Sequence, residues 1–337
     1  MYRGRTVGVV VPAYDEAGFV GGVLESVPDY VDRVYAVDDR SRDRTWAEIA
    51  ERASRLNRAA ATDRGRETVA AGAGFDRRIV PIRHDRNRGV GAAIATGYRR
   101  ALADGIDVTT VMAGDGQMDP ARLPALLDPI VEGDADYAKG NRLADGARDE
   151  MPRFRLVGNA ALTVLTRVAS GYWRTGDPQN GYTAISRRGL ERLDLEAVYD
   201  RYGYPNDLLV RCNAAGLRVA DVPMPARYGD EESSIAYATY VPTVSALLLR
   251  AFVRRLARRY PLRELHPVPL GYAAGALALA GSALEGARAL FGRRSSDGAT
   301  IGIGRAALLA VAGAASAGVA AGLERRLHAP LEVRRDG

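Results

Sequence analysis

Cysteine is almost absent from this sequence, and lysine is equally scarce. The single cysteine, Cys212, excludes an intramolecular disulfide and argues against a cysteine-built zinc site. It predicts a reducing compartment. Lys139 is the only lysine, so arginine carries almost all of the basic charge. An apolar leader is also lacking, because Arg3 and Arg5 lead directly into the first strand-like run, and we expect the N-terminus to stay in the cytosol.

The remaining composition is that of a folded protein. Hydrophobic residues make up 47% and charged residues 26% of the 337, which excludes a disordered or fibrous class. This length suffices for two domains, or for one domain with an appendage. The net charge of +6 arises near the C-terminus, where residues 241–337 hold 14 Arg and 6 acidic residues. Basic residues are not grouped with stacking aromatics, so we expect no nucleic-acid partner.

Apolar, β-branched runs alternate with helix-like stretches from residue 6 to residue 140. This alternation predicts βαβ units around a mostly parallel sheet with flanking helices. The predicted strands cover 6–11, 33–37, 78–83, 108–113 and 135–139, and the predicted helices cover 18–27, 45–56, 90–103 and 120–131. Ligands of such sheets bind outside the carboxyl ends of the strands, which here carry polar or glycine-bearing loops.

Two regions of the chain depart from this alternation. Residues 57–77 lack strong periodicity, and we expect a surface insertion there. Residues 141–232 are mixed. Their pattern predicts helices at 156–170 and 205–215, a loop at 175–182 and a strand at 218–222.

The C-terminal part changes character. Residues 241–259 predict an amphipathic, Arg-rich helix, and the apolar stretches 267–291 and 299–323 are long enough for two transmembrane helices. Small-residue pairs should let these helices approach closely, namely Gly271 with Gly275 and Gly318 with Gly322. Arginines flank the hairpin on both sides, so both flanks should be cytoplasmic.

Two other arrangements of the C-terminal part stay open. Packed soluble helices are one, because Glu285, Arg288 and Arg305 interrupt the apolar runs. In the other, the amphipathic helix alone lies among the lipid headgroups. The expected domains are therefore 1–235 for the α/β fold, 236–265 for the interfacial helix, 266–325 for the hairpin and 326–337 for a cytoplasmic tail.

Acidic residues follow the first two predicted strands. The first strand runs into VVVPAYDE, with Asp15 and Glu16, and the second runs into VDDRSRDRT, with Asp38 and Asp39. Such acids at one sheet edge can accept hydrogen bonds from the base and ribose of a nucleotide. The alternative is that each one caps a helix.

A glycine-bearing loop, NRGVGAA from Asn87 to Ala93, opens a predicted helix between the third and fourth strands. Its backbone N–H groups and the helix dipole could receive a diphosphate. A GxG pair by itself is a weak signal. We expect His84, just before this loop, to be a strand-end surface residue.

The fourth predicted strand ends in MAGDGQMDP, where Asp115, Gln117 and Asp119 lie within five residues. A hard divalent cation prefers oxygen ligands of this kind, with substrate phosphates completing its shell. We therefore expect Asp115 to bind metal. Asp119 precedes a proline and is interpreted as a helix N-cap.

Taken together, the motifs VVVPAYDE, VDDRSRDRT, NRGVGAA and GDGQMDP resemble the nucleotide-sugar-binding half of the family 2 glycosyltransferases with the GT-A fold. Three later segments, KGNR at 139–142, DPQNGYTAISRR at 177–188 and the stretch 202–229, are similar to the dolichyl-phosphate mannose synthase branch. The resemblance covers about residues 6–235 and implies a polyprenyl-phosphate acceptor.

The resemblance also implies roles for individual residues. Those expected in the nucleotide-sugar site are Pro12, Tyr14, Glu16, Asp38, Asp39, Asn87, Gly89 and Asp115. Asp115 and Gln117 would hold Mg²⁺ or Mn²⁺. Arg142 would meet phosphate or sugar, and Asp177 and Asp207 lie where the family has acids. Either acid is a candidate general base, with helix capping the alternative for Asp207.

Two departures from the family pattern stand out. The first carboxylate of the usual Asp-x-Asp is replaced by Ala113, which leaves the metal on Asp115, Gln117 and donor phosphates. A Ser-Lys pair that serves the acceptor phosphate in the synthase branch is Ser234–Ile235 here. Arg227 or the Arg-rich helix could substitute for that lysine.

The resemblance implies an inverting glycosyltransferase at the cell membrane, with its catalytic domain facing the cytoplasm. Its donor would be a UDP- or GDP-sugar and its acceptor a polyprenyl phosphate. One alternative is transfer to a hydroxyl of a glycan or glycolipid. Another is a non-catalytic nucleotide-sugar-binding protein, and a homo-oligomer also stays open.

Overall fold

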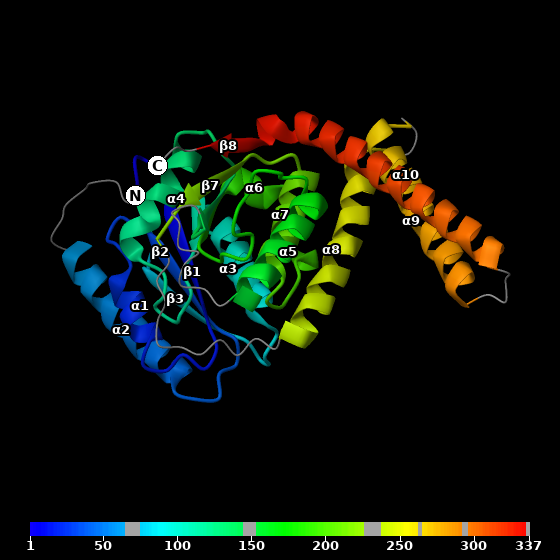
Figure 1. Cartoon of the computed structure of the whole chain (residues 1–337). Helices are drawn as coiled ribbons and strands as arrows, with labels where there is room; N and C mark the ends of the chain where they lie inside the picture. The colour runs from blue at the N-terminus through cyan, green and yellow to red at the C-terminus, as the bar shows by residue number, and fades with distance from the viewer. Residues whose placement is uncertain (65–74, 144–152, 226–236, 262–264, 292–295, 335–337) are drawn as a thin grey trace.

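The fold is an open α/β sheet with a helical hairpin attached (Figure 1). The computed structural model describes residues 1–64, 75–143, 153–225, 237–261, 265–291 and 296–334. The strand order is β3-β2-β1-β4-β6-β5-β7-β8, and only β6 runs antiparallel to its neighbours among the described strands. The strands are β1 (Val7–Ala13), β2 (Arg33–Asp38), β3 (Ile79–Arg83), β4 (Val108–Val111), β5 (Tyr137–Asn141), β6 (Thr183–Ser186), β7 (Val219–Pro223) and β8 (Glu332–Arg334).

Helices cover both faces of this sheet, as the alternation of strand and helix patterns predicts. They are α1 (Val20–Ser26), α2 (Thr45–Arg64), α3 (Val90–Ala103), α4 (Leu123–Val131), α5 (Arg153–Ser170), α6 (Arg187–Glu191), α7 (Tyr204–Ala214), α8 (Tyr237–Arg259), α9 (Pro267–Phe291) and α10 (Ser296–His328). Three 3₁₀ turns, Pro120–Arg122, Leu195–Ala197 and Ala329–Leu331, complete the described elements.

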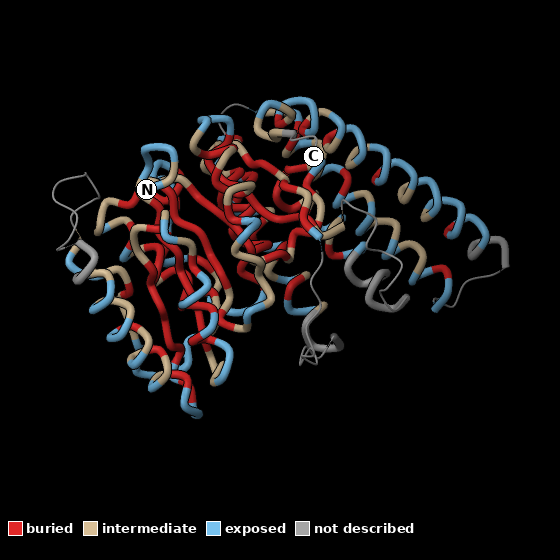
Figure 2. The backbone as a smooth tube through the Cα atoms, turned by 90° about the vertical axis from the view of Figure 1, so that its left-hand side faces the viewer, coloured by how far each residue is buried: buried red, intermediate tan, exposed pale blue. Residues whose placement is uncertain are grey.

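The core lies in two layers because strand side chains alternate between the faces of the sheet. Along β1, Val7, Val9 and Val11 pack under α1, α2 and α4, whereas Val10 packs on the other face with residues of α3 and α7. Figure 2 shows the sheet as the most continuously buried part of the chain. The predicted α/β architecture is therefore confirmed.

The predicted insertion at 57–77 is wrong over its first part, because α2 continues to Arg64. Asn57 explains the continuation: its side chain exchanges two hydrogen bonds with the backbone of Ile79, at 2.9 and 2.8 Å. Leu56 also packs against the core. The rest of the predicted insertion falls largely outside the described residues.

Helices α9 and α10 pack against each other as an antiparallel hairpin that projects from the α/β domain (Figure 1). Both are long and apolar enough to cross a membrane, and only 11% of each apolar window is buried. Gly271 and Gly275 do lie at the helix–helix contact, where a Cβ on Gly275 would come within 2.9 Å of the Gly313 carbonyl oxygen. The expectation for Gly318 and Gly322 is wrong, since nothing lies within 4 Å of a Cβ built there.

After the hairpin the chain returns to the sheet, so residues 326–334 of the expected cytoplasmic tail complete α10 and form β8. Strand β8 pairs in parallel with β7 at the sheet edge. The Glu332 carboxylate accepts hydrogen bonds from the backbone N–H groups of Trp173 and Arg174. Both ends of the hairpin are therefore fixed to the same domain.

A buried ion pair joins the base of the hairpin to the α/β domain. Arg255 of α8 and Glu324 of α10 are both fully buried, with 2.6 Å between Nη1 and Oε1. Arg255 also donates to the carbonyl oxygen of Ala169, and Glu324 accepts from the hydroxyl groups of Tyr260 and Tyr272. This arrangement links α5, α8, α9 and α10 at one point.

Candidate active site

A cavity of about 350 Å³ lies at the carboxyl ends of β1, β2 and β4. We refer to it as the first cavity. Seven of the eight residues expected in the nucleotide-sugar site line it, namely Pro12, Tyr14, Glu16, Asp39, Asn87, Gly89 and Asp115. Parallel strands explain this agreement, because their carboxyl ends share one edge of the sheet.

Asp38, the eighth expected residue, does not line the first cavity. Its side chain is fully buried, pairs with Arg83 at 2.9 Å and accepts a hydrogen bond from the backbone N–H of Ser41. Asp38 is the last residue of β2, and the side-chain alternation of a strand turns it away from its neighbour Asp39. Its role is to hold the loop that follows β2.

His84 is buried, so the prediction of a surface residue is wrong. Its Nδ1 lies 2.6 Å from the Asp39 carboxylate and its Nε2 lies 3.0 Å from the hydroxyl of Thr96. Asp39 also accepts hydrogen bonds from the backbone N–H groups of Arg88 and Gly89. Asp39 therefore fixes the glycine loop against the sheet.

At the start of α3, two of the N–H groups that were expected to face a diphosphate donate within the protein instead. The N–H groups of Gly91 and Ala92 donate to the carbonyl oxygen of Asp200, at 2.8 and 3.3 Å. A Cβ on Gly89 or Gly91 would collide with the backbone of Tyr199 or Asp200. The absence of side chains on these glycines therefore lets Tyr199 and Asp200 approach closely, and the carbonyl oxygen of Asp200 caps α3.

A second cavity of about 100 Å³ lies beside the first. Its lining residues include Asp115, Gln117, Arg122, Arg142, Asn180 and Tyr182. Asp115 is common to the linings of both cavities. A ligand that spans the two cavities would therefore pass this carboxylate.

Asp115 is suited to a divalent cation. Its Oδ1 accepts one hydrogen bond, from the backbone N–H of Gln117 at 3.0 Å, and among the described residues it has no ion-pair partner. Burial raises the pKa of Asp115 despite that hydrogen bond, because the carboxylate is poorly solvated. A nearby cation would stabilise its charged form.

No three acidic, His or Cys side chains gather into a metal cluster within the described ranges. A cation at Asp115 would therefore take its remaining oxygens from Gln117, substrate phosphates and water, as Mg²⁺ commonly does. Asp119 caps the turn at Pro120–Arg122, since its Oδ1 accepts from the N–H of Ala121. The N-cap prediction for Asp119 is confirmed.

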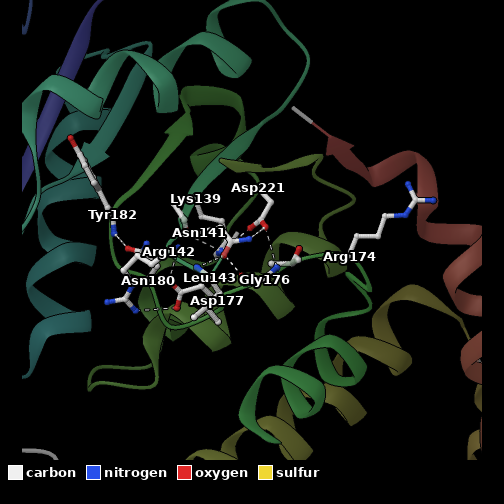
Figure 3. A network of polar contacts seen from close by, with 12 residues as sticks. Lys139, Asn141, Arg142, Leu143, Arg174, Gly176, Asp177, Asn180, Tyr182 and Asp221 are labelled. Atoms are coloured by element: carbon white, nitrogen blue, oxygen red, sulfur yellow. Dashed lines mark hydrogen bonds and ion pairs between the residues drawn. The ribbon is translucent and has the colours of Figure 1, made fainter. Parts of the chain in front are cut away.

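Arg142 reaches the second cavity and is oriented by Asp177 (Figure 3). Its Nε and Nη2 lie 2.7 and 3.0 Å from the two carboxylate oxygens, a bidentate contact that fixes the plane of the guanidinium. Burial alone would raise the pKa of Asp177, but the hydrogen bonds and charge of Arg142 outweigh it and the pKa is lowered. Asp177 is thus an ionised partner of Arg142.

The loop that carries Asp177 is held by a second polar contact network, also drawn in Figure 3. Lys139 is buried and donates to the carbonyl oxygen of Gly176 at 2.6 Å and to Asp221 at 2.9 Å. Asp221 accepts from Asn141 and from the N–H of Gly176. Sequence reasoning missed Asp221. Lys139, the one lysine in an Arg-rich chain, is the sequence feature that could have indicated a buried acidic partner such as Asp221.

Asp207 lies in α7 and lines neither cavity. Its carboxylate is fully buried between Arg211, at 2.5 Å, and Arg254 of α8, at 3.1 Å. It also accepts from the backbone N–H of Tyr199. A buried carboxylate that is paired with two arginines serves to hold structure. This geometry argues against the role of general base that was predicted for Asp207.

The model of the family described as "Glycosyl transferase family 2" matches residues 8–193. The chain belongs to glycosyl transferase family 2. It is therefore a glycosyltransferase enzyme, and the alternative of a non-catalytic nucleotide-sugar-binding protein is not supported.

Two curated relatives of this family 2 enzyme carry names that state an acceptor. The UDP-N-acetylglucosamine–dolichyl-phosphate N-acetylglucosaminyltransferase of Methanococcus voltae is 26% identical over 256 residues, covering 75% of this chain and 98% of the relative. The undecaprenyl-phosphate mannosyltransferase of Micrococcus luteus is 28% identical over 223 residues. The match covers 64% of this chain and 81% of that relative.

Among solved structures, glucosyl-3-phosphoglycerate synthase from Mycobacterium tuberculosis matches with a TM-score of 0.52 and 20% identity. The match covers 75% of this family 2 chain and 80% of the synthase. That crystal structure contains Mn²⁺, uridine diphosphate and glucosyl-3-phosphoglycerate. The likeness shows the GT-A type of α/β fold.

Proposed function

We propose that this enzyme transfers a sugar from a nucleotide diphosphate donor to a membrane lipid phosphate of the polyprenyl class. The donor would occupy the first cavity and the acceptor phosphate the second, with a divalent cation at Asp115 and Gln117. The names of the two curated relatives support the acceptor class, since both state a polyprenyl or dolichyl phosphate. The enzyme would work at the cytoplasmic face of the membrane.

The observation that carries this proposal is the state of Asp177 and Asp207, the two acids that the sequence offers as candidate general bases. A hydroxyl acceptor needs a general base to take its proton. Asp177 is committed to Arg142, and Asp207 is buried between two arginines. A lipid phosphate is already anionic, and its oxygen can attack without a base.

The reaction would be a single displacement at the anomeric carbon. The acceptor phosphate oxygen forms a bond to C1 from the face opposite the leaving diphosphate, and the bond from C1 to the diphosphate oxygen breaks. Arg142 and Arg122 supply positive charge to the second cavity, and Asp177 keeps the Arg142 guanidinium oriented. A bound Mg²⁺ or Mn²⁺ would neutralise charge on the departing nucleoside diphosphate.

Membrane attachment by the α9–α10 hairpin fits this acceptor. Leu277, Leu308 and Val319 are more than two-thirds exposed, which suits contact with lipid tails more than with water. Since β8 returns to the sheet, a hairpin that spans the bilayer has both ends on the side of the catalytic domain. The arginines that flank it would then lie at the cytoplasmic surface.

Product chemistry tests the proposal. Membranes that contain the enzyme are incubated with labelled UDP- and GDP-sugars, and the lipid extract is treated with mild acid. We expect a labelled lipid that releases its sugar, because a glycosyl phosphate is acid-labile. A labelled product that resists the acid would identify a glycoside instead and would refute the phosphate acceptor.

A further inference from the structure

The charges around the first cavity are unbalanced for a nucleotide diphosphate. Its lining includes three acids, Glu16, Asp39 and Asp115, and one cationic residue, Arg201. A diphosphate would bring further negative charge to this place. Even with a divalent cation at Asp115, a second positive group would stabilise the phosphates.

Four backbone N–H groups at and just before the start of α3, those of Arg88, Gly89, Gly91 and Ala92, are engaged within the protein. The N–H groups at the start of α3 donate to Asp39 and to the carbonyl oxygen of Asp200. The usual anion site of a helix N-terminus is thus taken up in large part by the protein itself. This leaves Arg201 as the cationic group that faces the first cavity among the described residues.

Arg201 lies on a short segment, Tyr199–Gly203, that is held from both sides. The carbonyl of Asp200 caps α3, and the N–H of Tyr199 donates to the buried Asp207 at 3.1 Å. Asp207 in turn pairs with Arg254 of α8. The backbone that carries Arg201 is therefore fixed, which reduces the entropy lost when its side chain meets a ligand.

The side chains of this segment are available to a ligand. Arg201 is exposed and, within the described part of the chain, lies in no ion pair or hydrogen bond through its guanidinium. Tyr202 beside it is 63% exposed and also lines the first cavity. An unpaired cation and an exposed aromatic ring at a cavity wall are typical of ligand contacts.

We propose that Arg201 binds the diphosphate of the nucleotide donor directly, and that the segment Tyr199–Gly203 is the wall that presents it. This inference rests on the proposed function, because it needs a nucleotide diphosphate in the first cavity. It also gives Asp207 a positioning role: the carboxylate ties this wall to α7 and α8.

Nucleotide affinities of matched variants test the inference. Titration calorimetry with Mn²⁺ compares the diphosphate that binds wild type, UDP or GDP, with its nucleoside. For Arg201→Ala we expect a roughly tenfold loss of diphosphate affinity, typical of one charged hydrogen bond, and an unchanged nucleoside affinity. Arg201→Lys should keep part of the diphosphate affinity. Arg86→Ala, an exposed arginine outside the cavity lining, should match wild type.

Kinetics give a second readout, in which Arg201→Ala raises the donor KM more than it changes the acceptor KM. Equal losses for diphosphate and nucleoside, or no loss for either, would overturn the inference. Failure of wild type to bind either diphosphate would instead refute the proposed function. Unchanged thermal unfolding of Arg201→Ala is expected, because the side chain is exposed.

Discussion

At the scale of single residues, Asp115 is the one acid common to the linings of the two described cavities. It lines both, it is partly buried, and it has no cationic partner among the residues that the structure describes. Ala113, two residues earlier, stands where the family resemblance leads us to expect another carboxylate. A site with one acid depends more strongly on that acid than a site with two.

Replacement of Asp115 by Asn should therefore abolish transfer and at the same time stabilise the metal-free protein slightly. Burial raises the pKa of Asp115, so the folded state disfavours the carboxylate, and this cost grows as pH rises above the unfolded value. Thermal unfolding at neutral pH, without metal, should show a gain of no more than about 3 °C. The gain should vanish at pH values below the unfolded pKa. A lower Tm for Asp115→Asn at neutral pH would contradict this account.

Asp177 permits a test of how Arg142 is positioned. Its φ of 36° lies in the left-handed region, which Asn tolerates better than most residues. Asp177→Asn should therefore fold normally but lose roughly tenfold in kcat/KM, because the charged bidentate contact with Arg142 is weakened. Asp177→Ala should lose activity similarly and also about 1 kcal/mol of stability. Full activity in Asp177→Asn would show that Arg142 needs no such support.

At the scale of elements, the junction of α8 with the hairpin is the contact most sensitive to substitution. Arg255→Met would leave Glu324 buried without its cation, at a cost of about 3 kcal/mol or more. Unfolding in detergent micelles should show this loss, while Arg250→Met, at an exposed position of the same helix, should change stability by less than about 0.5 kcal/mol. Adding Glu324→Leu to Arg255→Met should recover part of the loss. Equal stabilities of the two single variants would contradict a structural role for the pair.

The elements differ in how far they could be predicted from the sequence. Strands β1 to β4 are rich in β-branched residues, so local pattern is sufficient to predict them. The motifs after β1, β2 and β4 are predicted to meet because parallel strands share an edge. The capping of α3 by Asp200 and the burial of Asp207 depend on contacts between distant segments, which no local pattern encodes. Strand β8 has three residues and forms only because β7 offers it an edge.

At the scale of the whole molecule, the hairpin can be separated from the fold of the catalytic domain. Gly275 and Gly313 lie opposite each other, so residues 276–312 can be replaced by a short Gly/Ser loop without removing Glu324, His328 or β8. This shortened enzyme should fold, bind nucleotide and fail to float with liposomes. Truncation after residue 265 should aggregate, because Arg255 loses Glu324 and the sheet loses β8. Flotation of the shortened enzyme as efficient as that of wild type would refute membrane attachment by the hairpin.

The central claim is that the acceptor is an anionic lipid phosphate that needs no general base. The most direct measurement compares two acceptors with the purified full-length enzyme, Mn²⁺ and a labelled donor: a polyprenyl phosphate and the polyprenol of the same chain length. The account predicts labelled lipid from the phosphate and none from the alcohol, because Asp177 and Asp207 are both held in ion pairs. Comparable transfer to the polyprenol would contradict it.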